Sequence, residues 1–153
     1  MKNFILTFSL FLFSLCAFGQ SFSYKTIISK KGAYITEIKN LESNNEISLY
    51  SLSAQNSEYK TFVDNFTITT SGAQGLYDFL IKVQKFEEET KDEKNVVRFI
   101  DDIKVQIMRI PVLGTSIFIY KDYKHHDFKP STINGFIKKF KKYCDKKNIT
   151  FYY

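Results

Sequence analysis

Tryptophan is absent from this chain, and cysteine, proline, glycine and histidine are scarce. Its 153 residues include two Cys, two Pro, six Gly and two His. So few cysteines exclude a disulfide-rich scaffold and a cysteine-built zinc finger. The low proline and glycine content, beside 44% hydrophobic residues, is typical of a folded domain rather than a disordered chain. Phosphate-binding loops, dinucleotide fingerprints and nucleophile elbows are also missing, so no familiar enzyme class is indicated.

Long apolar runs are lacking too, with one exception at the N-terminus. Residues 4–15 are almost wholly apolar, follow Lys2, and precede the small-residue pattern Ala-Phe-Gly at 17–19. A run of this length is typical of a cleavable signal peptide and is too short for a membrane-spanning helix. We therefore predict a signal peptide at 1–19 and a single small domain at 20–153, exported from the cytoplasm.

Two alternatives to a released protein are an uncleaved anchor and a lipoprotein lipidated on Cys16. Lipoprotein signals place a small residue directly before the cysteine, whereas Leu15 stands here, so release is preferred. The Phe-rich run ending in Ala-Phe-Gly-Gln resembles signal peptides of the Bacteroidetes, which implies a bacterial envelope protein. No glycine-rich sorting domain follows, so a periplasmic location is expected rather than an extracellular one.

Cleavage would leave Cys144 as the only cysteine, so no disulfide could form within the mature domain. The chain is rich in aromatic residues instead, with 16 Phe and 10 Tyr. We therefore expect a core that is held together by aromatic and aliphatic packing.

The periodicity of apolar residues predicts the secondary structure. Alternating patterns predict strands over the following ranges, the last one short: 22–28, 33–39, 46–53, 59–70, 102–110, 115–121 and 149–153. Helical spacing predicts one helix from Ser71 towards Glu87, with Ser71 and Gln74 as a capping box, and a second from Pro130 through Cys144. The strands come in runs rather than alternating with helices. The order ββββ-α-ββ-α(-β), which shows no internal repeat, predicts an α+β domain with an antiparallel meander sheet of about six strands and both helices on one face.

Positive charge is concentrated in the C-terminal part, where residues 121–153 carry nine Lys and three Asp. In the second predicted helix, one face opposite the apolar stripe carries four lysines: Lys138, Lys139, Lys142 and Lys146. This face could bind phosphate, an anionic polysaccharide, lipid headgroups or an acidic protein, or it could simply be solvated. The helix has no arginine for bidentate contacts with bases, so nucleic acid is not expected as a partner.

A hydrophobic contact is the second candidate feature. Tyr77 and Ile81 lie one turn apart, beside the apolar stripe of the first predicted helix. They either widen the buried face of that helix or form an exposed contact for a partner.

His125 and His126, with Asp122 and Asp127 nearby, have side chains of the types that bind metals. Adjacent residues in an extended segment point in opposite directions, however, and the chain has no third histidine. Cys144 is in register with the apolar stripe, which predicts a buried thiol rather than a nucleophile. We therefore expect no metal and no cofactor.

The first functional hypothesis is an exported binding or interaction domain without catalysis. It would hold a protein or a small apolar ligand on its sheet or in the groove between sheet and helix. One alternative is a small envelope hydrolase that uses His125 or His126 with a nearby acid or with Cys144. The other is an electrostatic binder of an anionic envelope polymer through the lysine-rich helix. No transmembrane segment is predicted in the mature chain.

Overall fold

The structure is a computed structural model, and it describes residues 21–41, 48–55, 65–122 and 124–152. The predicted signal peptide lies outside these residues, as does the beginning of the predicted fourth strand.

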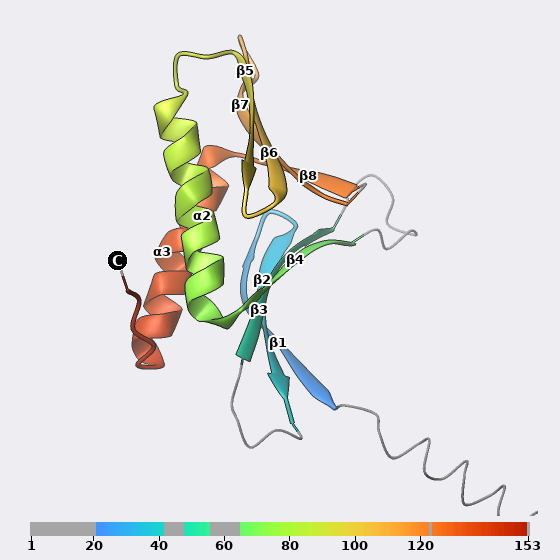
Figure 1. Cartoon of the computed structure of the whole chain (residues 1–153), viewed down its shortest axis with the longest axis vertical. Helices are drawn as coiled ribbons and strands as arrows, with labels where there is room; N and C mark the ends of the chain where they lie inside the picture. The colour runs from blue at the N-terminus through green and yellow to red at the C-terminus, as the bar shows by residue number, and fades with distance from the viewer. Residues whose placement is uncertain (1–20, 42–47, 56–64, 123, 153) are drawn as a thin grey trace, which may run out of the picture.

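The chain folds into two four-stranded antiparallel sheets, each followed by one helix (Figure 1). The first unit comprises β1 (Phe22–Lys30), β2 (Ala33–Asn40), β3 (Ser48–Gln55), β4 (Asn65–Ser71) and α2 (Gly72–Glu89). The second comprises β5 (Asn95–Ile100), β6 (Ile103–Ile110), β7 (Gly114–Lys121), β8 (Lys124–Phe128) and α3 (Pro130–Lys146). In each sheet the strands lie in chain order. The topology ββββα therefore occurs twice, although the sequence itself shows no repeat.

The predicted α+β class, with antiparallel strands and two helices, is confirmed, but the single sheet of six strands is wrong. Strands β5 and β8 escaped prediction because neither shows clean alternation. In β5, Val97 and Phe99 are exposed while Arg98 lies on the helix side, and in β8 only Phe128 is buried. The predicted last strand is also wrong, since residues 149–152 form no strand.

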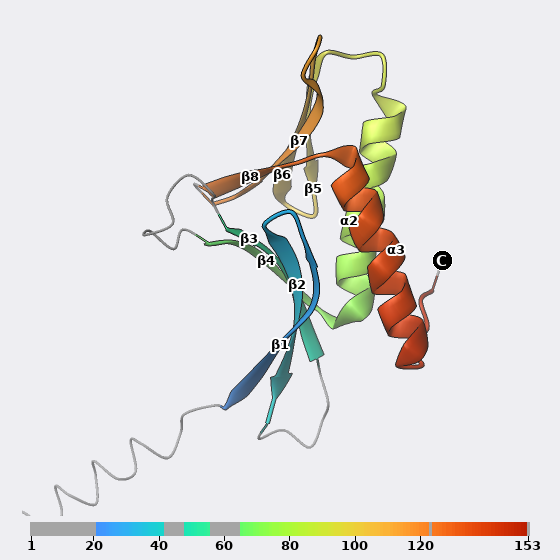
Figure 2. The same ribbon diagram turned by 180° about the vertical axis from the view of Figure 1, so that it is seen from behind.

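Helices α2 and α3 pack against each other and lie on the same side of both sheets (Figures 1 and 2). Their predicted apolar stripes are buried, except that Ile137 of α3 is only partly buried: Leu76, Phe79, Leu80, Val83 and Phe86 in α2, and Ile133, Phe136, Phe140 and Cys144 in α3. The two sheets meet where β4 contacts β7 and β8, and there the rings of Phe66 and Phe128 pack edge to face at 6.3 Å. In the described part of the chain, neither helix has the long apolar stretch needed to cross a membrane.

Candidate functional site

A carboxylate occupies a core position of the first sheet. In β2, Ala33, Ile35 and Glu37 alternate onto the side that faces the helices, and Glu37 is only 6% exposed. Glutamate is rarely buried to this degree unless it is paired, because its charge loses the hydration it has in water. Because a buried glutamate is unusual, Glu37 is the first candidate functional residue of this fold.

Two phenols flank the Glu37 carboxylate. Tyr50 lies directly opposite Glu37 in β3, and its hydroxyl donates a hydrogen bond to Glu37 Oε1 at 3.0 Å. The Tyr50 ring is held by edge-to-face packing on Phe140 of α3, at 5.3 Å between ring centroids. Tyr143 lies in the same helix, α3, and carries the second hydroxyl. This hydroxyl is buried and makes no hydrogen bond to the described residues. Burial first, and then the nearby Glu37, raise the pKa of Tyr143 to about 12. The same two causes raise the pKa of Tyr50.

Glu37 lines a hollow of about 530 Å³ between the first sheet and the helix ends. We call it the Glu37 pocket, and three segments line it: Glu37, Lys39, Ser48 and Tyr50 from β2 and β3; Gly72 and Ala73 from the start of α2; and Lys147 and Ile149 from the segment after α3. Lys39 follows Glu37 by two residues on the same face of β2, about 7 Å along the strand. Lysines 39 and 147 thus place positive charge on the rim of a pocket that contains a carboxylate.

Backbone hydrogen bonds hold the segment after α3 that forms one wall of the Glu37 pocket. The backbone N–H groups of Lys147 and Ile149 donate to the carbonyl oxygen of Cys144, at 2.9 and 3.0 Å. The predicted capping box at the start of α2 is wrong, because the Ser71 side chain makes no capping hydrogen bond. Gln74 bonds to the backbone of Tyr152 instead, donating to its oxygen at 3.0 Å and accepting from its nitrogen at 2.9 Å.

The lysine-rich face of α3 borders a second, smaller hollow. Three of the four predicted lysines, Lys139, Lys142 and Lys146, line a space of about 310 Å³ against Ile27, Ile28 and Ser29 of β1. Lys138 is exposed on the helix and does not line this space. Tyr143 also lines this hollow, and Glu37, which lines the other one, contributes to the raised pKa of the Tyr143 hydroxyl.

The other predicted features lie away from the Glu37 pocket or within the core. Tyr77 is buried and stacks on Phe151 at 4.2 Å, and Ile81 is partly buried against the core, so the exposed-contact interpretation of this pair is wrong. The pair widens the buried face of α2.

The two histidines lie on opposite faces of β8. His125 is exposed and stacks on Tyr120 at 5.2 Å, whereas His126 packs edge to face on Phe128 at 4.8 Å. Burial lowers the pKa of His126. Among the described residues, no three His, Cys, Asp or Glu side chains gather where they could hold a metal ion.

Cys144 is fully buried in α3 and is the free cysteine of the described chain. Burial, followed by the negative charges of Asp145 and Glu37, raises the pKa of its thiol to about 12. At neutral pH the thiol is protonated, so it lacks the thiolate that a nucleophile requires.

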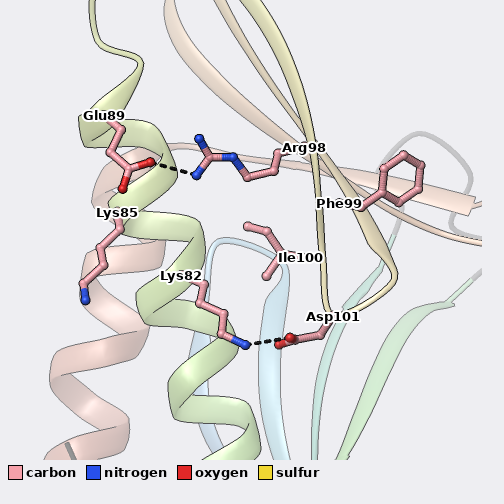
Figure 3. Close-up of a pocket in the computed structure, with 7 residues that line it drawn as sticks. All are labelled: Lys82, Lys85, Glu89, Arg98, Phe99, Ile100 and Asp101. Atoms are coloured by element: carbon pink, nitrogen blue, oxygen red, sulfur yellow. Dashed lines mark hydrogen bonds and ion pairs between the residues drawn. The ribbon is translucent and has the colours of Figure 1, made fainter.

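A further hollow, of about 330 Å³, separates α2 from β5 (Figure 3). Four of its five charged side chains are paired across the gap: Lys82 with Asp101 at 2.6 Å, and Arg98 with Glu89 at 2.7 Å. Phe99 points away from α2 to the other face of β5 (Figure 3). Two ion pairs therefore bridge helix and sheet across this hollow, whereas Lys85 of α2 also lines it and takes part in neither pair.

Glu37, Lys39, Tyr50 and Lys147 did not stand out in the sequence. One signal was available, namely a glutamate in phase with the apolar residues of a predicted strand. No protein-family model matches the chain, and no curated protein or solved structure is significantly similar to it.

Proposed function

We propose that this protein is an exported, non-catalytic binding domain that holds a small zwitterionic ligand in the Glu37 pocket. The observation that carries the proposal is a buried glutamate that lines the same hollow as Lys39 and Lys147. Such an arrangement presents one negative and two positive groups to a single ligand.

The charges determine which ligand fits. An ammonium group would sit against Glu37, where its charge compensates the carboxylate that the fold has removed from water. A carboxylate or phosphate on the same ligand would reach the two lysines, about 7 Å away along β2 in the case of Lys39. A volume of about 530 Å³ falls within the usual range for small-molecule sites and suits an amino acid or a short peptide.

The groups around Glu37 favour binding over bond making. The Tyr143 phenol and the Cys144 thiol both have a pKa of about 12, and the pKa of Tyr50 is also raised. They therefore stay protonated at neutral pH and act as hydrogen-bond donors or packing groups rather than as nucleophiles or bases. This chemistry also weighs against the hydrolase hypothesis that pairs Cys144 with a histidine.

Calorimetric titration of the mature chain tests the proposal. The probes are glycine, glutamate and phosphoethanolamine, with ethylamine and acetate as ligands that carry only one of the two charges. Zwitterions should bind more tightly than either single-charge ligand. The isosteric variant Glu37→Gln keeps an acceptor for Tyr50 and should weaken binding about tenfold or more, through the loss of a charged hydrogen bond.

The matched control is Lys91→Gln, an exposed lysine that does not line the pocket, and it should bind like the wild type. Equal affinity in Glu37→Gln and wild type would contradict the proposal. So would the failure of every zwitterionic probe to bind.

An anionic polymer is a second candidate ligand, favoured by the three lysines that border the hollow between β1 and α3. Binding to dextran sulfate should then weaken steeply as salt rises and should disappear when Lys138, Lys139, Lys142 and Lys146 are all replaced by Gln. Binding that survives both changes would exclude this surface.

A further inference from the structure

The hairpin between β6 and β7 ends in four consecutive apolar residues that protrude into solvent: Ile110, Pro111, Val112 and Leu113. Val112 is as exposed as an isolated residue, at 105%, and Leu113 is 69% exposed. This tip forms one end of the molecule, at the top of Figure 1. Single exposed apolar residues are common, whereas a contiguous apolar projection marks a contact surface.

The backbone of Val112 strengthens this conclusion. Its φ is +77°, in the left-handed region that glycine and asparagine adopt readily and that β-branched residues avoid. An asparagine or glycine here would relieve the strain at the loss of an apolar side chain. The chain therefore keeps an apolar group at the apex of the hairpin against its own conformational preference, and strain of this kind gathers at functional positions.

The composition of the tip favours hydrocarbon over a protein pocket. Residues that anchor protein interfaces are mainly Trp, Tyr and Arg, whereas Leu and Val are under-represented among them. The tip has only aliphatic side chains, and none of them can form a hydrogen bond. Beside the tip, the Lys129 ammonium donates to Ser116 Oγ at 3.0 Å and to the carbonyl oxygen of Leu113 at 3.4 Å, so a positive charge that would attract a lipid phosphate borders the aliphatic side chains.

We propose that the tip at 110–113 inserts into the interface of a lipid bilayer and docks the protein on a membrane surface. A tip of this length enters the headgroup and upper acyl region and is far too short to cross a hydrocarbon core of roughly 30 Å. The proposal is independent of the Glu37 pocket, because no residue is shared between them.

The absence of tryptophan makes a direct test available. Leu113→Trp places a single fluorophore in the tip, and vesicles of phosphatidylcholine with phosphatidylglycerol should shift its emission to the blue. Lipids brominated near the glycerol end of the acyl chain should quench it. The matched control is Tyr24→Trp, a residue that is 69% exposed in β1, the strand whose beginning lies near the opposite end of the molecule in Figure 1, and its emission should not change.

Loss of the tip provides the second test. The double variant Val112→Asn/Leu113→Ser should partition into the same vesicles about a hundredfold less well, since two aliphatic side chains no longer leave water. Circular dichroism verifies that this variant is folded. Binding of the wild type should persist at high salt, which distinguishes insertion from electrostatic docking through α3.

Unshifted emission of Leu113→Trp would overturn the proposal. Equal partitioning of the folded double variant and the wild type would do the same.

Discussion

Replacing Val112 by Asn should stabilise the protein, although it removes an apolar side chain. Val112 is fully exposed, so the substitution loses no packing. Its φ of +77° imposes the left-handed conformation, which destabilises an ordinary residue by roughly 1–2 kcal/mol and which asparagine tolerates well. The expected gain is therefore about 1 kcal/mol, or a rise in Tm of about 3–5 °C for a domain of this size.

Thermal unfolding followed by circular dichroism measures the effect. Leu113→Asn is the matched control, because Leu113 is next in the chain, is also exposed, and does not have a positive φ. Its Tm should change little. If Val112→Asn left Tm unchanged or lowered it, the claim that this backbone is strained would be refuted, and with it one of the two arguments for a functional tip.

Three further predictions follow from the core and its buried groups. Phe140→Ala should lower the free energy of unfolding by about 3–5 kcal/mol in urea titrations, because the ring is fully buried and packs on Tyr50; a loss below about 1 kcal/mol would contradict that packing. Cys144 should stay unreactive towards a thiol-specific disulfide reagent at neutral pH until the protein unfolds, and rapid labelling of the native protein would show that the thiol is accessible. The free energy of unfolding should fall as pH rises from 9.0, the ordinary pKa of a thiol, towards 12. The thiol of the unfolded chain ionises in this range, whereas burial raises the pKa of native Cys144 to about 12, so the native thiol keeps its proton. An unfolding free energy that does not change across this range would contradict the prediction.

The helices and most strands were predictable because the apolar periodicity of each element lies within its own residues. Both helices have apolar residues at helical spacing, and the stripes from Leu76 to Phe86 and from Ile133 to Cys144 are buried as expected. Strand β5 was not predictable by alternation, because Arg98 takes a helix-side position where it pairs with Glu89, while Phe99 faces solvent. A pattern that depends on an ion pair with another element cannot be recognised from the strand alone.

The Glu37 pocket was beyond prediction for a related reason. It is assembled from β2, β3, the start of α2 and the segment after α3, which are adjacent only in the folded chain. Tyr50 and Glu37 are opposite each other because of the register of β2 with β3. The lysines of α3 were predictable as an exposed face, since helical spacing alone defines it, but their position beside β1 was not.

The most direct test of the central claim is a titration of the isotope-labelled chain from residue 20 onward with glutamate or phosphoethanolamine, followed by amide chemical shifts. The account predicts saturable shifts at Lys39, Gly72, Ala73 and Lys147, which line the Glu37 pocket, and none in the hairpin at 110–114. The same titration of Glu37→Gln should require a much higher ligand concentration. Shifts located elsewhere, or an identical response from Glu37→Gln, would contradict the assignment of this pocket as the binding site.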